Sequence, residues 1–250
     1  MIASAATPTA NPNLATLLFY TCVTKEVKNQ CNESFTLDQA ESANAGFTAN
    51  FTTIEQGHRV GMSSLFATHD VFFENGMGMR PDWEARWADA SKKLAPLIKA
   101  RKVVGFFLGD ELLSGGKISV ANLSTALRAV DALKKQYPTY NLVAWENEGG
   151  GKPTSRWVNY VKTELGGMLP KELDAFSIDD YSLDAAGHRQ FYESTIYPML
   201  HPHQSVFLVP GSYSTGHDRS KSEWCCGGDT AAACDACIVK QLKQPPALDP

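Results

Sequence analysis

The chain has 250 residues, of which 43% are hydrophobic, and a formal net charge of −4. This length and apolar content are enough to bury one large core and are typical of a single α/β barrel domain. The acidic balance, the lack of a basic stripe and the lack of any apolar run near the roughly 18 residues of a membrane span argue against nucleic-acid and membrane partners.

Short apolar segments alternate with helical patterns along the chain. Strands are expected at 14–20, 46–51, 60–67, 103–108, 142–145, 175–178 and 205–209, of which 46–51 is the weaker candidate. The segments 103–108, 142–145 and 175–178 have the composition of strands buried on both faces. Capping residues and apolar positions at helical spacing predict helices at 37–45, 81–98, 120–136, 157–165 and about 188–200. This alternation predicts the parallel strands of one α/β sheet.

Seven strands in series favour a (βα)8 barrel over an open doubly wound sheet, which usually carries five or six. The eighth strand is the difficulty, because residues 218–250 contain no convincing strand. We therefore expect a TIM-barrel-like fold that is incomplete at the eighth strand, or a fragment of a longer protein. Residues 1–13, rich in Ala, Thr, Pro and Asn, are expected to form a disordered leader. Residues 14–250 are expected to form a single domain with a Cys-rich C-terminal segment.

The cysteines and glycosylation sequons favour a secreted or extracellular protein. Three Asn-x-Ser/Thr sequons begin at Asn32, Asn50 and Asn122. Cys22 and Cys31 flank a loop that a disulfide would close. Disulfides are also expected, with zinc binding as the alternative, for Cys225, Cys226, Cys234 and Cys237. The observation against secretion is that the first residues lack the basic start and long apolar stretch of a signal peptide.

Three consecutive strand segments end in carboxylates. Asp110-Glu111 follows the fourth segment, Glu146-Asn147-Glu148 follows the fifth, and Asp179-Asp180 follows the sixth. Parallel strands point the same way, so these ends are expected to meet at one edge of the sheet. Clustered carboxylates repel one another and are costly to desolvate, so they favour a functional site over a structural role.

Strict alternation along each strand predicts which acids point into the barrel. With the bulky residues of the fourth strand assigned to the helix side, Glu111 faces the barrel axis and Asp110 the helices, where it is free to act as a cap. The same reasoning sends Glu146 and Asp179 inward. Crowded acids raise the pKa of at least one of them, as a general acid requires, while an ionised partner acts as nucleophile or base.

Other side chains near the same edge are suited to holding a sugar. Aromatic faces with polar tips fit sugar rings, and the candidates are Tyr20, Trp145, Tyr181 and Tyr213. His69, Asp110 and Asn147 are candidates for positioning the substrate. No metal site is predicted, because the histidines lack paired spacing, although Ca²⁺ or Mg²⁺ at the acidic edge stays open.

With these motifs the chain resembles the glycosidase-like (βα)8 superfamily. The motifs are Gly-Asp-Glu at 109–111, Trp-Glu-Asn at 145–147 and Ser-Ile-Asp-Asp-Tyr at 177–181, and the resemblance spans about residues 14–213. The chain departs from the large retaining clan, which places a nucleophilic Glu at strand seven, because 209–213 contains no carboxylate. It also lacks the spaced Asp residues of the chitinase-like signature.

The sequence therefore predicts a carbohydrate-active hydrolase that cleaves O-glycosidic bonds in a polysaccharide or oligosaccharide, without a cofactor. In this hypothesis Glu111 is the acid, and Asp179 or Glu146 is its partner. The alternatives are a non-catalytic glycan-binding protein on the same scaffold and a lyase or isomerase assisted by a divalent ion. The sugar, the anomeric outcome and the oligomeric state stay open.

Overall fold

The computed structural model describes residues 18–19, 45–59, 61–74, 78–116, 118–180 and 185–207. Several expectations lie outside these residues: the leader 1–13, residues 37–44 of the expected helix, the Cys-rich C-terminal segment, and Cys22 and Cys31. The last residue of that expected helix, Ala45, is instead the first residue of a strand. Tyr20, Tyr181 and Tyr213 also lie outside the described residues.

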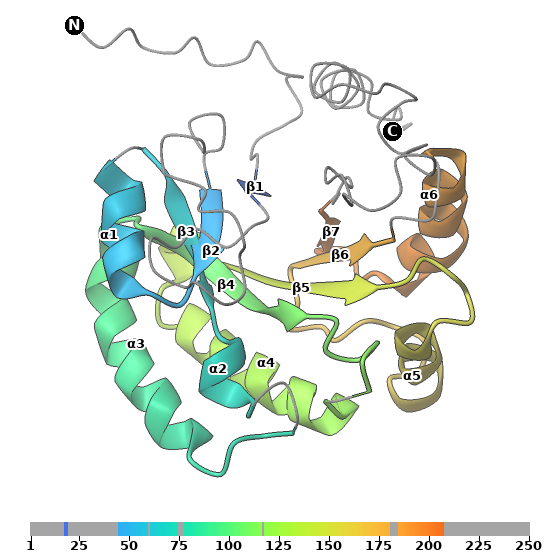
Figure 1. Cartoon of the computed structure of the whole chain (residues 1–250), viewed down its shortest axis with the longest axis horizontal. Coiled ribbons are helices and arrows are strands. Elements are labelled where there is room, and N and C mark those ends of the chain that lie inside the picture. Colours follow the sequence, from blue (N-terminus) through green and yellow to red (C-terminus); the bar gives the residue numbers. More distant parts are fainter. Residues whose placement is uncertain are drawn as a thin grey trace, which may run out of the picture.

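Seven strands form one sheet in which every neighbouring pair is parallel and the spatial order follows the chain order. They are β1 (Leu18–Phe19), β2 (Ala45–Thr48), β3 (Ser63–Ala67), β4 (Val103–Asp110), β5 (Val143–Gly149), β6 (Ala175–Asp179) and β7 (Ser205–Val206). A doubly wound sheet reverses direction at a switch point, whereas a (βα)8 barrel winds one way only. The predicted α/β barrel-like fold is therefore confirmed, and the described residues supply seven of its strands (Figure 1).

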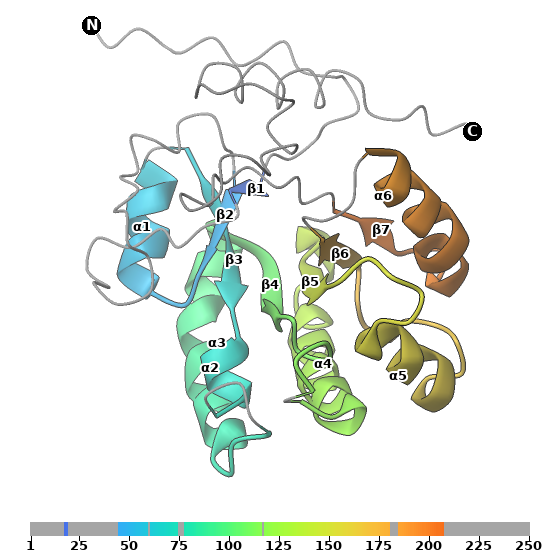
Figure 2. The ribbon, with the colours of Figure 1, turned by 45° about the vertical axis from the view of Figure 1, so that its right-hand side comes forward.

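The helices lie on the outer side of the curved sheet (Figures 1 and 2). They are α1 (Phe51–Arg59), α2 (His69–Phe72), α3 (Trp83–Lys99), α4 (Val120–Lys134), α5 (Arg156–Glu164) and α6 (Ala185–Phe191). A 3-10 turn at Pro138–Tyr140 precedes β5, and α6 continues into a π-helical turn (Tyr192–Ile196) and a 3-10 turn (Tyr197–Met199). None of the helices in the described part of the chain is long and apolar enough to cross a membrane.

Helix α1 is absent from the sequence prediction, which placed a strand at 46–51 and began the next one at residue 60. The helix begins after Asn50, whose Oδ1 accepts the N–H groups of Thr52 and Thr53 at 2.8 and 3.3 Å. This side-chain cap satisfies backbone N–H groups of the first turn, which have no acceptor within an α-helix. Strand β3 consequently begins only at Ser63.

Residues of the sheet alternate between two apolar clusters. Phe106, Leu108 and Phe176 belong to the large core that the sheet shares with α3, α4 and α5. Leu65, Phe107, Trp145 and Ala175 form a smaller cluster without any helical residue. We call the first side of the sheet the helix face and the second the inner face. The inner face is thus filled by side chains, as the interior of a small barrel is.

Candidate active site

The carboxyl ends of β4, β5 and β6 form one edge of the sheet, which we call the rim. Strand β4 ends there in a β-bulge: Phe107 pairs with Trp145 and Asp110 with Asn147, so two residues of β4 oppose the single residue Glu146. An extra residue reverses the side on which the following side chain emerges. Asp110 therefore lies on the inner face with Asn147, and its assignment to the helix face is wrong.

A chain of buried hydrogen bonds leads across the inner face to Asp110. Trp145 Nε1 donates to Ser177 Oγ at 2.8 Å, and Ser177 Oγ donates to Asn147 Oδ1 at 2.6 Å. Asn147 Nδ2 then donates to Asp110 Oδ1 at 2.8 Å. Asn147 and Ser177 are fully buried, so their polar groups need these partners. The chain fixes the amide of Asn147 with its N–H groups toward the carboxylate and so anchors Asp110 at the rim.

Glu111 follows the bulge and lies directly over the end of β5. Its backbone N–H donates to Asn147 O at 2.8 Å, and its φ of 52° is in the left-handed region, which costs a non-glycine residue about 1–3 kcal/mol. A Cβ on Gly149 would come within 2.0 Å of Glu111 Oε1. The carboxylate thus occupies space that only a glycine leaves free.

Asp179 lies on the other side of the same glycine. It pairs with Gly149 in the β5–β6 ladder and follows Ser177 on the inner face, as the sequence predicts. Adjacent strands are about 4.8 Å apart, so Glu111 and Asp179 belong to neighbouring positions of one rim. Asp179 is 8% exposed. The next residue, Asp180, accepts the N–H of Gly151 and so serves the β5–α5 loop.

The expectation that Glu146 faces the barrel axis is wrong. Ala144, two residues earlier, packs in the core beneath the helices, whereas Trp145 packs in the inner cluster. Glu146 therefore lies on the helix face, 1% exposed, beside the fully buried Glu148. The structure does not bring Glu146 to Glu111 and Asp179.

Burial raises the pKa of Glu146 well above its usual value, and the charge and hydrogen bond of Glu148 raise it further. Burial also raises the pKa of Glu148, although hydrogen bonds from Ser114, Glu146 and Leu113 act in the opposite direction. The hydrogen bond between the two carboxyls raises the pKa of Glu146 and lowers that of Glu148, so it favours Glu146 as the protonated donor and Glu148 as the acceptor. Glu148 is a fully buried residue of β5.

Trp145 does not form part of the exposed rim. It is fully buried on the inner face, with its ring centroid 4.4 Å from that of Phe107 and 5.5 Å from that of Phe207. The sequence prediction ended the strand at Trp145, but β5 continues to Gly149 and places the indole beneath the rim. His69 begins α2 just after β3 and contacts the Asp70 carboxylate at 3.0 Å.

The rim carries the carboxyl groups of Glu111 and Asp179 on either side of Gly149. It also carries a third carboxyl group, that of Asp110, which accepts a hydrogen bond from the Asn147 amide. A pair of carboxyls can divide the roles of acid and of base or nucleophile. The sequence motifs contain these acids and Ser177, but they assign no role to Ser177, Gly149 or Ser114, which fix the surroundings of the acids. No group of three His, Cys, Asp or Glu side chains in the described ranges is placed to hold a metal ion.

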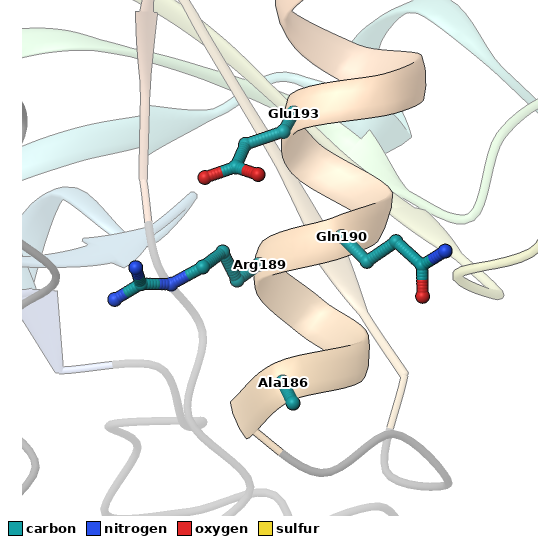
Figure 3. A pocket seen from close by; sticks show the side chains of 4 residues that line it. All are labelled: Ala186, Arg189, Gln190 and Glu193. Atoms are coloured by element: carbon teal, nitrogen blue, oxygen red, sulfur yellow. The ribbon is translucent and has the colours of Figure 1, made fainter.

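A shallow hollow lies elsewhere, on the side of α6. Its lining residues all come from this one helical segment and are exposed (Figure 3): Ala186, Arg189, Gln190 and Glu193. It contains no buried polar group, in contrast to the rim.

No protein-family model and no curated protein matches the chain. Among solved structures, Gas2 in complex with a small compound has a TM-score of 0.49 at 12% identity, over 75% of this chain and 45% of that chain. A mutant of Saccharomyces cerevisiae Gas2p in complex with laminaritetraose and laminaripentaose has a TM-score of 0.44 at 11% identity, over 75% and 44%. The Penicillium canescens endo-1,4-beta-xylanase XylE has a TM-score of 0.44 at 12% identity, over 71% and 67%. The chain spans less than half the length of the Gas2 structures.

Proposed function

We propose that the rim is the active site of a carbohydrate-active hydrolase that cleaves O-glycosidic bonds. Glu111 protonates the leaving oxygen, and Asp179 acts as the nucleophile or as the base that activates water. Asp110, anchored through Asn147, accepts hydrogen bonds from sugar hydroxyls, and His69 contacts the substrate from the end of β3.

The observation that carries this proposal is the position of the two acids around Gly149. Glu111 reaches over this glycine from the β4 loop, and Asp179 stands beside it on β6. Glycoside hydrolysis needs two carboxyl groups close together on either side of the scissile bond. Sites of single-wound parallel barrels lie at the carboxyl ends of the strands, where both acids are found.

The first test is sugar release from a panel that includes laminari-oligosaccharides, xylan, cellulose and chitin, with Glu111→Gln and Asp179→Asn measured beside the parent. We expect the parent to release sugar and each variant to lose about 10²- to 10⁴-fold in kcat, the usual contribution of a general acid or base. Nuclear magnetic resonance of the first product would then distinguish retention from inversion.

Glu193→Gln, in the exposed hollow of α6, is the matched control and is expected to keep the parent's rate. Unchanged turnover in Glu111→Gln would contradict the assignment of the acid. Tight glycan binding without product release would favour a non-catalytic binding protein, and loss of activity on chelation would favour the reaction assisted by a divalent ion.

A further inference from the structure

The loop between β4 and α4 is held from below by the carboxylate of Glu148. Glu148 Oε1 accepts the N–H of Leu113 at 2.7 Å, and Oε2 accepts the N–H of Ser114 at 2.8 Å. Oε2 also accepts the hydroxyl of Ser114. Three donors from one turn thus converge on a single carboxylate that is fully buried. Such charge-assisted hydrogen bonds are about twice as strong as neutral ones.

Ser114 connects this carboxylate to the glycine beneath Glu111. The N–H of Gly149 donates to Ser114 Oγ at 3.0 Å, and the carbonyl of Gly149 lies 2.9 Å from the same oxygen. Because the hydroxyl has one hydrogen, it serves Glu148 or the carbonyl at any moment, while it continues to accept from Gly149. The loop and the end of β5 are therefore fixed to each other at the point over which Glu111 lies.

Glu111 itself belongs to this turn. Its carbonyl accepts the N–H of Gly115 at 3.1 Å, and its left-handed backbone needs support from its surroundings. The hydrogen bonds of Leu113 and Ser114 to Glu148 close the turn just after it. If the turn opened, the backbone of Glu111 would be free to leave its strained conformation, and the carboxyl group would leave Gly149.

We propose that Glu148 is a positioning residue, which acts through Ser114 and the 111–116 turn to hold the Glu111 carboxyl at the rim. Its effect on turnover rests on the proposed function, whereas its effect on the geometry of the turn does not. Glu148 touches no substrate in this arrangement, because it lies on the helix face of β5 while the site lies on the inner face.

The test uses Ser114→Ala and Ser114→Thr as a matched pair, since only threonine retains the hydroxyl. In Ser114→Ala we expect the amides of the 111–116 turn to exchange hydrogen for deuterium at least tenfold faster, and the ¹³C shift of the Glu111 carboxyl carbon to move. We expect kcat on the panel substrate to fall about 10- to 100-fold with KM changed less than twofold, as for a misplaced reacting group. In Ser114→Thr the amide exchange rates, the Glu111 carbon shift and kcat should all match those of the parent.

Glu148→Gln extends the test to the carboxylate itself while keeping its shape. It retains one acceptor oxygen for the two amides, so we expect faster exchange at Leu113 or Ser114. Asp174→Ala is the control, because that carboxylate also accepts a strand amide, that of Ala144, but at the opposite end of β5. It should leave the Glu111 carbon shift and kcat unchanged.

The outcomes separate the two proposals. Unchanged exchange and an unchanged Glu111 carbon shift in Ser114→Ala and Glu148→Gln would overturn the positioning role. Amide exchange and the carbon shift do not depend on turnover, so they test the positioning role of Glu148 even for a protein that releases no sugar. A changed carbon shift with unchanged kcat would leave the positioning intact and overturn Glu111 as the acid.

Discussion

Glu146 lies in surroundings that suit a neutral acid and oppose a charged one. It is buried between the sheet and the helices, and its Oε1 has no hydrogen-bond partner within the described part of the chain. The neighbouring Glu148 accepts its proton in a hydrogen bond and would repel its ionised form. A carboxyl of this kind makes the stability of the fold depend on pH.

We therefore expect the free energy of unfolding to fall as the pH rises. The pKa of Glu146 is raised in the folded state above the usual 4.5, so its stabilising contribution is fully present below about pH 4.5. The contribution is lost as the pH rises through the raised folded value, by about 1.4 kcal/mol for each unit between the two pKa values. Glu146→Gln keeps a donor toward Glu148 but cannot ionise, so it should lose less stability between pH 5 and pH 8 than the parent.

Urea unfolding at pH 5 and pH 8 measures the free energy of unfolding of the parent and of Glu146→Gln. Glu84→Gln, an exposed change on α3, is the control and should follow the parent. An equal fall in the parent and in Glu146→Gln would mean that Glu146 does not carry this pH dependence.

At the scale of the elements, the rim depends on how β4 and β5 end. A Cβ on Gly149 would come within 2.0 Å of Glu111 Oε1 and 2.6 Å of its Cδ, and these atoms are the far end of an exposed side chain. In Gly149→Ala the carboxyl should therefore move, at a cost to the free energy of unfolding of about 1 kcal/mol or less. We expect kcat to fall about tenfold or more, because the displaced group no longer meets the scissile bond.

Steady-state kinetics and thermal unfolding of the same samples test this separation of activity from stability. Gly57→Ala is the matched change, since its new Cβ meets nothing nearer than Met62 Cβ at 3.7 Å. It lies within α1, where alanine favours the helix over glycine by about 1 kcal/mol. It should keep full activity, and parental activity in Gly149→Ala would refute the placement of Glu111.

Apart from the four-residue helix α2, which it does not predict, the sequence predicts the order and centres of the described strands and longer helices from β3 to β7, because apolar runs and helical spacing are local signals. It fails on the faces of β4 and β5 for two physical reasons. The bulge beside Gly109 shifts Asp110 to the inner face, and strict alternation cannot anticipate an extra residue. In β5 both faces are buried, so the bulk of Trp145 does not indicate the helix side. Glu146 was misplaced as a result.

At the scale of the whole molecule, the two ends of the sheet carry different polar groups. The amino end holds Asp174, whose Oδ2 accepts the N–H of Ala144 at 2.6 Å and also binds the ammonium of Lys134 on α4. This contact ties the start of β6 to β5 and to a helix. The carboxyl end holds Asp110, Glu111 and Asp179. Barrel folds commonly separate stability at the amino end from chemistry at the carboxyl end.

Asp174→Ala tests whether this molecule follows that division. It removes the acceptor of a strand amide and the partner of a lysine, which should lower the free energy of unfolding by about 1–3 kcal/mol. The lower half of this range is expected, because the Asp174 side chain is 31% exposed and solvent screens the ion pair. Turnover by the folded fraction should be unchanged, since β5 and β6 run the length of the sheet between Asp174 and the rim.

Urea unfolding measures the change in the free energy of unfolding, and kcat is measured at urea concentrations well below the unfolding transition. A fall in kcat without a fall in stability would show that the two ends are coupled through the strands, and would assign part of the rim's geometry to the register that Asp174 holds.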